Sequence, residues 1–109
     1  ITGRKKELII KGGENISPRE IDDTLYKHNA VLEACTFGIA DDNYGEEISA
    51  CVFLKENLKT NEKELKDLCT ADLGEYKTPS QIIFVDKPLP KGPSGKIQRL
   101  KIASLYNRA

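Results

Sequence analysis

The clearest pattern along the chain is an alternation of apolar and polar positions over residues 47–55. Four apolar residues at alternate positions fall on one face of an extended chain: Ile48, Ala50, Val52 and Leu54. Because side chains two positions apart share a face, this alternation predicts a strand with one buried face. Apolar runs over residues 7–11, 33–40 and 81–86 predict further strands.

The first helix signal follows a glycine turn. Gly12 and Gly13 predict a sharp turn, and residues 14–16 return from it. Ser17 and Glu20 then have the spacing of a capping box around a proline at the first helical position. We expect this helix to run to about His28, which we interpret as a surface residue.

Two more helices are expected further along the chain. Asn61 and Glu64 form a second capping box, and the helix that they open would end at Gly74. A last helix is expected over residues 98–106. Its predicted apolar contacts are Leu100, Ala103 and Leu105.

The order of these elements indicates a fold class. Strands lie next to each other in the chain, and the helices are too few for a doubly wound parallel sheet. We therefore expect an α+β fold, a small mixed β-sheet with flanking helices plus a short N-terminal β-hairpin. A length of 109 residues suits one domain over residues 1–109. The chain opens on Ile1 and contains no methionine, so we expect a fragment of a longer chain.

Composition argues against several kinds of site. No apolar run approaches the roughly 18–20 residues that cross a bilayer, and the basic start lacks the apolar segment of a secretory signal. The cysteines are widely spaced, without the close pairs of metal sites: Cys35, Cys51 and Cys69. We therefore expect buried reduced thiols, no metal site and an intracellular protein, with the cytoplasm as the favoured compartment.

The net charge is zero, but the charges are unevenly distributed. Residues 1–11 carry four Lys/Arg against one acid, residues 12–86 carry seven against sixteen, and residues 87–109 carry six against none. Basic ends can bind a polyanion or can simply be solvated. Tyr106 is the only aromatic residue in the basic segments, so a stacking platform for nucleic acid is absent. A compact phosphate site fits better, because glycines and prolines accompany the charges.

The first candidate for chemistry is the segment Lys-Gly-Pro-Ser-Gly-Lys over residues 91–96. Prolines stiffen the loop, glycines permit unusual backbone angles, and Lys96 stands just before a helix. A lysine held in this way offers positive charge to a phosphate or a developing oxyanion. A P-loop is excluded, because Pro90 replaces its first glycine and Ile97 its magnesium-binding hydroxyl. The alternative is a solvated turn with an incidental lysine.

The second candidate lies near the N-terminus. Residues 3–7 are basic around Arg4, whose guanidinium can hold phosphate oxygens with two N–H donors. Gly12 and Gly13 would let a ligand approach the backbone closely. The alternative is a basic strand edge beside an ordinary hairpin.

Together, the two segments resemble motifs of the acyl-adenylate-forming enzymes, which include acyl-CoA synthetases, peptide-synthetase adenylation domains and firefly luciferase. Residues 3–21 are similar to the hinge motif of that superfamily, and residues 90–97 to the motif that carries its catalytic lysine. Residues 29–46 also resemble its mobile domain. The resemblance covers essentially the whole chain. It implies the small C-terminal domain, without the large N-terminal domain that holds most of the ATP site and the acid pocket.

The resemblance implies a reaction in two steps. A carboxylate attacks the α-phosphate of ATP and gives an acyl-adenylate; after the small domain rotates, a thiol attacks that adenylate. By position, Lys96 would act in the first step, Arg4 would lie near the ATP phosphates or ribose, and Lys6 would be the hinge. Gly13 would line the pantetheine tunnel in the second step, within the run Gly12, Gly13, Glu14 and Asn15. ATP, CoA and Mg²⁺ are the implied cofactors, the last two bound mainly with the N-terminal domain.

Departures from these motifs indicate which subclass of acyl-adenylate-forming enzymes the chain resembles most. Luciferase and plant aryl-CoA ligases usually carry lysine where this chain has Ile10, and Lys11 would point to the opposite face. The run over residues 12–16 looks more like fatty acyl-CoA ligases. We therefore expect part of an ATP-dependent acyl-CoA synthetase for a carboxylic, most simply fatty, acid, inactive as this fragment alone.

The expected partners are the enzyme's own N-terminal domain and its small-molecule substrates, not nucleic acid. The alternatives are an adenylation enzyme that loads a carrier-protein thiol, and a freestanding nucleotide-binding module.

Overall fold

The computed structural model describes residues 7–107 of the chain. Its centre is a three-stranded sheet in the order β3 (Val31–Asp41), β4 (Gly45–Leu54) and β5 (Gln81–Val85). The first pair is antiparallel and the second pair is parallel. The expected mixed sheet is therefore confirmed, and each predicted strand is present with slightly different ends.

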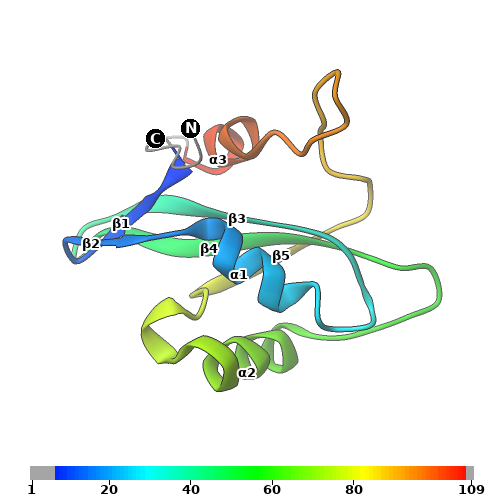
Figure 1. The fold of residues 1–109 in the computed structure, drawn as a ribbon, viewed down its shortest axis with the longest axis horizontal. Coiled ribbons are helices and arrows are strands. Elements are labelled where there is room, and N and C mark those ends of the chain that lie inside the picture. Colours follow the sequence, from blue (N-terminus) through cyan, green and yellow to red (C-terminus); the bar gives the residue numbers. More distant parts are fainter. Residues whose placement is uncertain (1–6, 108–109) are drawn as a thin grey trace.

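Helices connect and cover these strands. Helix α1 (Pro18–Leu25) precedes the sheet, and α2 (Glu62–Leu73) with the 3₁₀ helix η2 (Glu75–Lys77) makes the crossover between the parallel strands. Helix α3 (Arg99–Tyr106) ends the described chain. Figure 1 shows α3 on one side of the sheet and α1 and α2 on the other. No helix within residues 7–107 is long and apolar enough to cross a membrane.

A short hairpin precedes the first helix, as the sequence predicts. Strands β1 (Ile9–Lys11) and β2 (Glu14–Ile16) pair antiparallel across the glycine pair. Ile9 and Ile16 face each other in this ladder, and both are fully buried. The hairpin is thus fixed to the domain by apolar burial at its base, and the turn projects from it.

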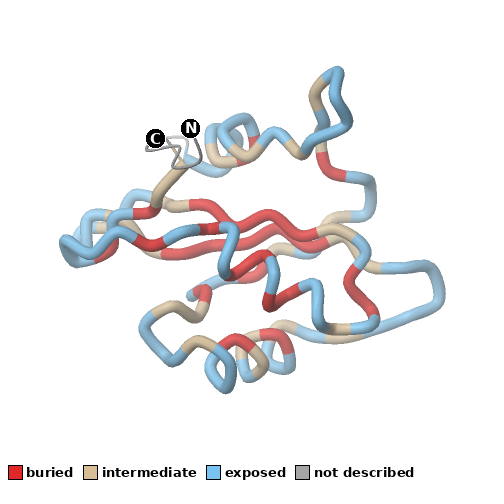
Figure 2. The backbone as a smooth tube through the Cα atoms, in the orientation of Figure 1, coloured by how far each residue is buried: buried red, intermediate tan, exposed pale blue. Residues whose placement is uncertain are grey.

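Each face of the sheet carries its own hydrophobic cluster. The larger cluster lies against α1 and α2, and its members from the helices are Ile21, Leu25, Leu65 and Cys69. The smaller cluster lies against α3 and consists of Cys35, Phe37, Cys51, Leu89 and Ile102. Figure 2 shows the buried positions concentrated along the strands and on the inner sides of the helices.

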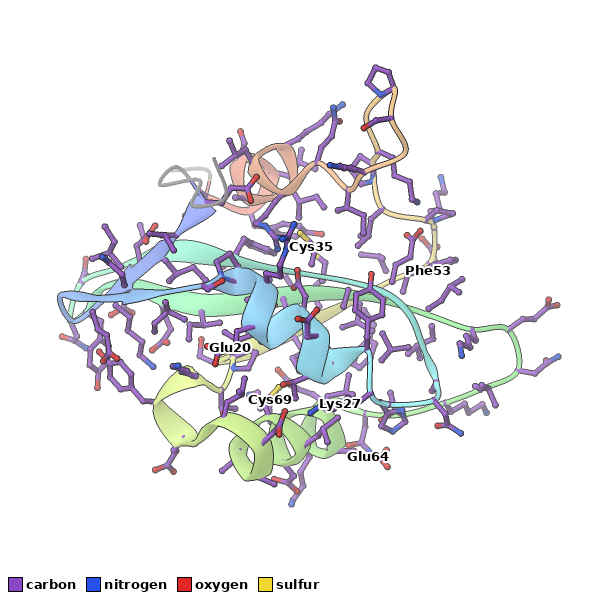
Figure 3. The ribbon with its side chains drawn as sticks, in the orientation of Figure 1. Glu20, Lys27, Cys35, Phe53, Glu64 and Cys69 are labelled. Carbon is purple, nitrogen blue, oxygen red and sulfur yellow. The ribbon has the colours of Figure 1, made fainter. Side chains whose placement is uncertain are left out.

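All three cysteines are free and buried, in agreement with the expectation from spacing. Cys35 and Cys51 face each other across β3 and β4, in the smaller cluster. Cys69 belongs to the larger cluster, and Figure 3 shows it on the opposite side of the sheet from Cys35. Burial raises the pKa of the Cys35 thiol to about 12 and that of the Cys69 thiol to about 11.

A β-bulge interrupts β3 at Leu32. Val31 pairs with Leu54 of the neighbouring strand, whereas Glu33 pairs with Phe53, so one extra residue stands between them. Bulges of this kind shift the alternation of side chains along a strand. Val31 lies in the larger cluster, and from residue 33 onwards the odd-numbered residues face α3 instead.

The first predicted capping box is wrong, and the second is right in its main bond. Ser17 is the N-cap of α1, but its side chain makes no capping hydrogen bond, and its carbonyl accepts the Glu20 N–H instead. The Glu20 carboxylate binds Lys77 at 2.9 Å, so a tertiary contact replaces the local one. The Asn61 side chain accepts the Glu64 N–H at 2.7 Å, as predicted.

The predicted apolar face of the last helix is wrong for Leu100 and Leu105 and right for Ala103, which packs against the smaller cluster. Ile102 is buried, whereas Leu100 and Leu105 are each 49% exposed. The cause is Arg99, whose side chain is fastened to the sheet at the first turn of α3. Residues three and four positions further on share its side of the helix, and so Ile102 faces the sheet.

The prediction for the end of the first helix requires a correction as well. Helix α1 ends at Leu25, three residues before the predicted end at His28. The side chain of His28 is only 15% exposed, so it is not the surface residue that we expected. Its Nδ1 accepts the Ala30 N–H at 3.1 Å, and its Nε2 lies 3.4 Å from a Glu64 carboxylate oxygen.

Candidate functional site

Lys96 stands on a short hairpin over residues 91–97, called the lysine hairpin below. The two ends of the segment form an isolated antiparallel bridge. The Gly92 N–H donates to the Lys96 carbonyl at 2.9 Å, and the Gly95 N–H donates to the Gly92 carbonyl at 2.9 Å. Gly95 has a φ of +84°, a left-handed conformation that glycine adopts most readily and that commonly closes three-residue hairpin loops. The glycines therefore give Lys96 a defined place.

The side chain of Lys96 is exposed and has no hydrogen bond or ion pair within residues 7–107. It borders a groove of about 510 Å³ between the lysine hairpin, β3 and α1. The charged residues that line the groove are Glu7, Arg19, Asp22, Asp23, Glu33, Lys91, Lys96 and Arg99. An anion that enters the groove would meet Lys96 without displacing a described partner of that ammonium.

Arg99 fastens α3 to the domain three residues after Lys96. Its Nη1 donates to Asp22 Oδ2 at 2.7 Å and to the Thr36 carbonyl at 2.9 Å. Its Nε lies 3.4 Å from Glu7 Oε1. Burial raises the pKa of the Asp22 carboxyl, and the charge of Arg99 and its hydrogen bond offset part of that rise. The network joins α1, β3 and α3 directly beside the lysine hairpin.

The name glycine turn is used below for residues 12–15, which are the two glycines that connect β1 to β2 and the first two residues of β2. Gly12 and Gly13 have φ angles of +58° and +82°, as two-residue hairpin turns require. The side chains of Glu14 and Asn15 are exposed. A Cβ added at Gly13 would meet no described atom within 4 Å. A side chain there would clash with no described part of the domain, but the positive φ of Gly13 would strain the turn.

Lys11 is a buried cation at the base of the glycine turn. Its Nζ donates to the Tyr76 carbonyl at 2.8 Å and lies 3.0 Å from Glu47 Oε1. The same Nζ lies 4.4 Å from the centroid of the Tyr76 ring, a cation–π contact. The Tyr76 hydroxyl donates back to the Lys11 carbonyl at 2.6 Å, and the Gly12 N–H donates to the Tyr44 carbonyl at 2.7 Å. The backbone at the start of the turn is therefore held by both Tyr76 and Tyr44.

The expected difference between neighbouring residues of β1 is confirmed. Ile10 is 50% exposed, whereas Lys11 is 6% exposed. The Lys11 ammonium therefore lies inside the domain. It is not available at the surface position that Ile10 occupies.

The structure brings only some of the predicted site residues together. Gly12, Gly13, Glu14 and Asn15 share the glycine turn, and Figure 1 shows that turn at the opposite end of the domain from the lysine hairpin. Arg4 and Lys6 lie outside the described residues. Within residues 7–107, no group of three or more His, Cys, Asp or Glu could hold a metal ion.

Three residues that support the two candidate features were not predicted from the sequence. Glu33 carried a usable signal, because a charged residue inside an apolar strand segment needs a partner. Arg99 is a cation at the start of a predicted helix, and its acidic partner lies 77 residues away in the chain. Tyr76 gave no signal, since its neighbours form no regular pattern.

Comparison with known proteins agrees with the fold and with the expected family. Residues 20–96 match the family described as AMP-binding enzyme C-terminal domain. The chain is 53% identical over 102 residues to the sulfoacetate–CoA ligase of Cupriavidus necator, and 46% identical over 102 residues to the mitochondrial medium-chain acyl-CoA ligase of Rattus norvegicus. Each alignment covers 94% of this chain, but only 20% and 16% of the two relatives.

A solved structure gives the same result. The fatty acyl CoA synthetase of Mycobacterium tuberculosis superposes with a TM-score of 0.88 at 33% identity, over 98% of this chain and 21% of that chain. The chain thus spans about a fifth of the length of the proteins it matches. The family match includes both the lysine hairpin up to Lys96 and the sheet that supports it. The chain therefore belongs to the AMP-binding enzyme C-terminal domain family, as the resemblance of its motifs predicted.

Proposed function

We propose that this domain is the mobile C-terminal part of an ATP-dependent acyl-CoA synthetase. In this proposal the lysine hairpin serves adenylation and the glycine turn serves transfer to the thiol. The observation that carries it is the placement of these two features at opposite ends of one small domain (Figure 1). One feature presents an ammonium without a described partner, and the other presents open backbone at Gly13.

Lys96 would act in the first step. A carboxylate oxygen of the acid attacks the α-phosphorus of ATP, and the bond from that phosphorus to pyrophosphate breaks. Negative charge spreads over the transferring group, and a fixed ammonium stabilises it. Lys96 suits this role because the hairpin fixes its backbone while its side chain stays available. Arg4 would lie near the ATP phosphates or ribose, and Mg²⁺ would accompany ATP, held mainly by the N-terminal domain.

The glycine turn would act in the second step, after the domain rotates about Lys6. The thiol sulfur attacks the carbonyl carbon of the adenylate, AMP leaves, and the thiol gives up its proton. The pantetheine arm of CoA would pass Gly12 and Gly13, beside Glu14 and Asn15. The absence of a Cβ at Gly13 lets that arm approach the backbone, whereas the space beside Gly12 is occupied by the Tyr76 hydroxyl.

We propose a carboxylic acid as substrate, with a fatty acid as the first candidate. The names of two relatives specify different acids, sulfoacetate and medium-chain acyl groups, although both are 46–53% identical to this chain. Similarity in the sequence of this domain therefore does not indicate which acid the whole enzyme uses. That supports an acid pocket in the N-terminal domain, which the proposal requires.

The test uses the full-length protein that carries this domain. Acid-dependent exchange of pyrophosphate into ATP reports adenylation, and thioester formation from preformed adenylate reports the second step. Lys96→Ala should lower the exchange rate by about 10²–10³-fold and spare thioester formation. Lys101→Ala, at an exposed lysine of α3 near the same hairpin, is the matched control and should change neither rate.

The complementary variant is Gly13→Leu. It should block thioester formation and spare exchange, because its side chain projects into open space, and a thermal melt checks that the strain of leucine at this positive φ leaves the domain folded. Equal losses in both steps for both variants would contradict the assignment of the two features. Thioester formation with a carrier protein but not with CoA would favour the carrier-protein alternative.

A further inference from the structure

We infer that Glu33 is a positioning residue for the adenylation step: it fixes the lysine hairpin to β3 and thereby sets the place of Lys96. The inference rests on the proposed function of Lys96. It concerns a residue that lies outside both motifs from which that function was proposed.

The β-bulge at Leu32 aims Glu33 at the hairpin. Val31 packs in the larger cluster, and in an uninterrupted strand residue 33 would share its face. The extra residue turns Glu33 to the other face, the one that Cys35 shares with α3. Bulges commonly re-aim a side chain next to a functional site. Here the bulge places a carboxylate under the segment that leads to Lys96.

Glu33 binds that segment at two points. Its Oε1 accepts the Leu89 N–H at 2.8 Å, and its Oε2 lies 2.5 Å from Lys91 Nζ. Lys91 Nζ also donates to the Leu89 carbonyl at 3.2 Å, which closes a small ring of contacts. The Glu33 side chain is only 16% exposed. Charge-assisted hydrogen bonds that are shielded from water hold their geometry better than exposed ion pairs.

The constraint reaches Lys96 through the backbone. Lys91 is bridged to Ile97, and the Pro90 carbonyl accepts the Gln98 N–H at 2.9 Å. Since proline also fixes φ at the base, the hairpin tilts as one piece. A tilt at Lys91 therefore displaces Lys96, which lies on the returning arm of the hairpin, one residue before the bridged Ile97. Misplacement of a catalytic group by about 1 Å can cost about 10²-fold in rate.

The experiment measures both half-reactions of the full-length protein with three variants. Glu33→Gln keeps an acceptor for the Leu89 N–H and removes the charge, Lys91→Met removes the other charge, and Glu33→Ala removes every contact. Acid-dependent exchange should fall about 10-fold for the first two variants and about 10²-fold for Glu33→Ala, with KM for ATP and acid changed by less than about twofold. Thioester formation from preformed adenylate should stay at the wild-type rate, since Lys96 has no role in that step.

Glu56→Gln is the matched control, because it makes the same chemical change at an exposed residue of the loop after β4. It should leave both rates unchanged. If Glu33→Ala does not fold, the exchange rate of Glu33→Gln tests the inference, since this variant keeps the size of the side chain and one hydrogen bond. A thermal melt of each variant shows whether it is folded.

Two outcomes would overturn the inference. Either the Glu33 variants keep the wild-type exchange rate while Lys96→Ala loses it, or both half-reactions fall by the same factor. The first outcome leaves the proposed function standing. If Lys96→Ala itself keeps the wild-type exchange rate, the proposed function is wrong and the inference fails with it.

Discussion

Replacement of Arg99 by methionine tests how the domain is held together. The side chain of Arg99 is 14% exposed and that of Asp22 is 10% exposed, and their charged atoms lie 2.7 Å apart. Arg99→Met keeps an apolar stem of similar reach but removes the contacts to Asp22, to the Thr36 carbonyl and to Glu7. Asp22 would keep the Thr36 N–H and lose its counter-charge.

The expected cost follows from that loss. Removal of one partner of a buried ion pair costs about 3–5 kcal/mol of the free energy of unfolding. The lower end applies here, because Asp22 can take up a proton: burial already raises the pKa of its carboxyl. A loss of about 3 kcal/mol corresponds to a fall in Tm of about 12 °C for a domain of this size.

The cost should also depend on pH. Without Arg99 the pKa of Asp22 rises further, so the folded state binds its proton more tightly than the unfolded state. Below the ordinary aspartate pKa of 3.8, both states carry the proton and the ionisation penalty vanishes. As pH rises above that value, the unfolded state ionises first and stability falls. The deficit of Arg99→Met should therefore be larger at about pH 7 than at about pH 4.

Urea unfolding of the 109-residue chain, followed by circular dichroism, measures these effects. Asp22→Asn and the double variant complete a double-mutant cycle, and the double variant should cost at least about 1 kcal/mol less than the sum of the single ones. Arg19→Met, at an exposed arginine of α1, is the control and should stay within about 0.5 kcal/mol of wild type. A loss below about 1 kcal/mol for Arg99→Met, typical of a surface pair, would refute the reasoning.

Three further predictions follow from single contacts. Ile102→Ala should cost about 2–5 kcal/mol of the free energy of unfolding and Leu105→Ala less than about 1 kcal/mol, because the first is 1% and the second 49% exposed; equal costs in urea unfolding would contradict the orientation of α3. Tyr76→Phe removes the 2.6 Å hydrogen bond to the Lys11 carbonyl, and the urea midpoint should fall by the equivalent of about 1 kcal/mol; an unchanged midpoint would show that the hydroxyl adds no net stability. Since burial raises the pKa of Cys35 to about 12, the native chain should react slowly with an aromatic disulfide reagent at about pH 8, and denaturant should make the thiols react at once; fast labelling of the native chain would contradict their burial.

The strands were predictable because their signal is local. Alternation over residues 47–55 depends only on which side chains face the sheet, and the observed strand β4 places the same four residues against the larger cluster. The turn at Gly12 and Gly13 was predictable for the same reason, since positive φ favours glycine wherever the turn stands. Lys96 and the glycine turn were found through motif resemblance, which is also local in sequence.

What the sequence did not reveal depends on contacts between distant residues. The capping box at Ser17 fails because Glu20 finds Lys77, 57 residues away. The face of α3 is set by Arg99, which binds residues 63 and 77 positions earlier. The role of Glu33 depends on a bulge that no residue type marks. The residue pattern within one segment cannot predict the partner of Glu20, the buried face of α3 or the bulge before Glu33.

The separation of the two hydrophobic clusters has a consequence for how such a domain diverges. Ile9 and Ile16 at the base of the glycine turn belong to the larger cluster, whereas Leu89 before the lysine hairpin belongs to the smaller one and Ile97 at the end of that hairpin packs against it. The strand backbones lie between the clusters, so a change of side-chain volume is absorbed on one face of the sheet. Substitutions beneath one turn then need no compensating substitution beneath the other. The two turns can accumulate changes independently over generations while they share one scaffold.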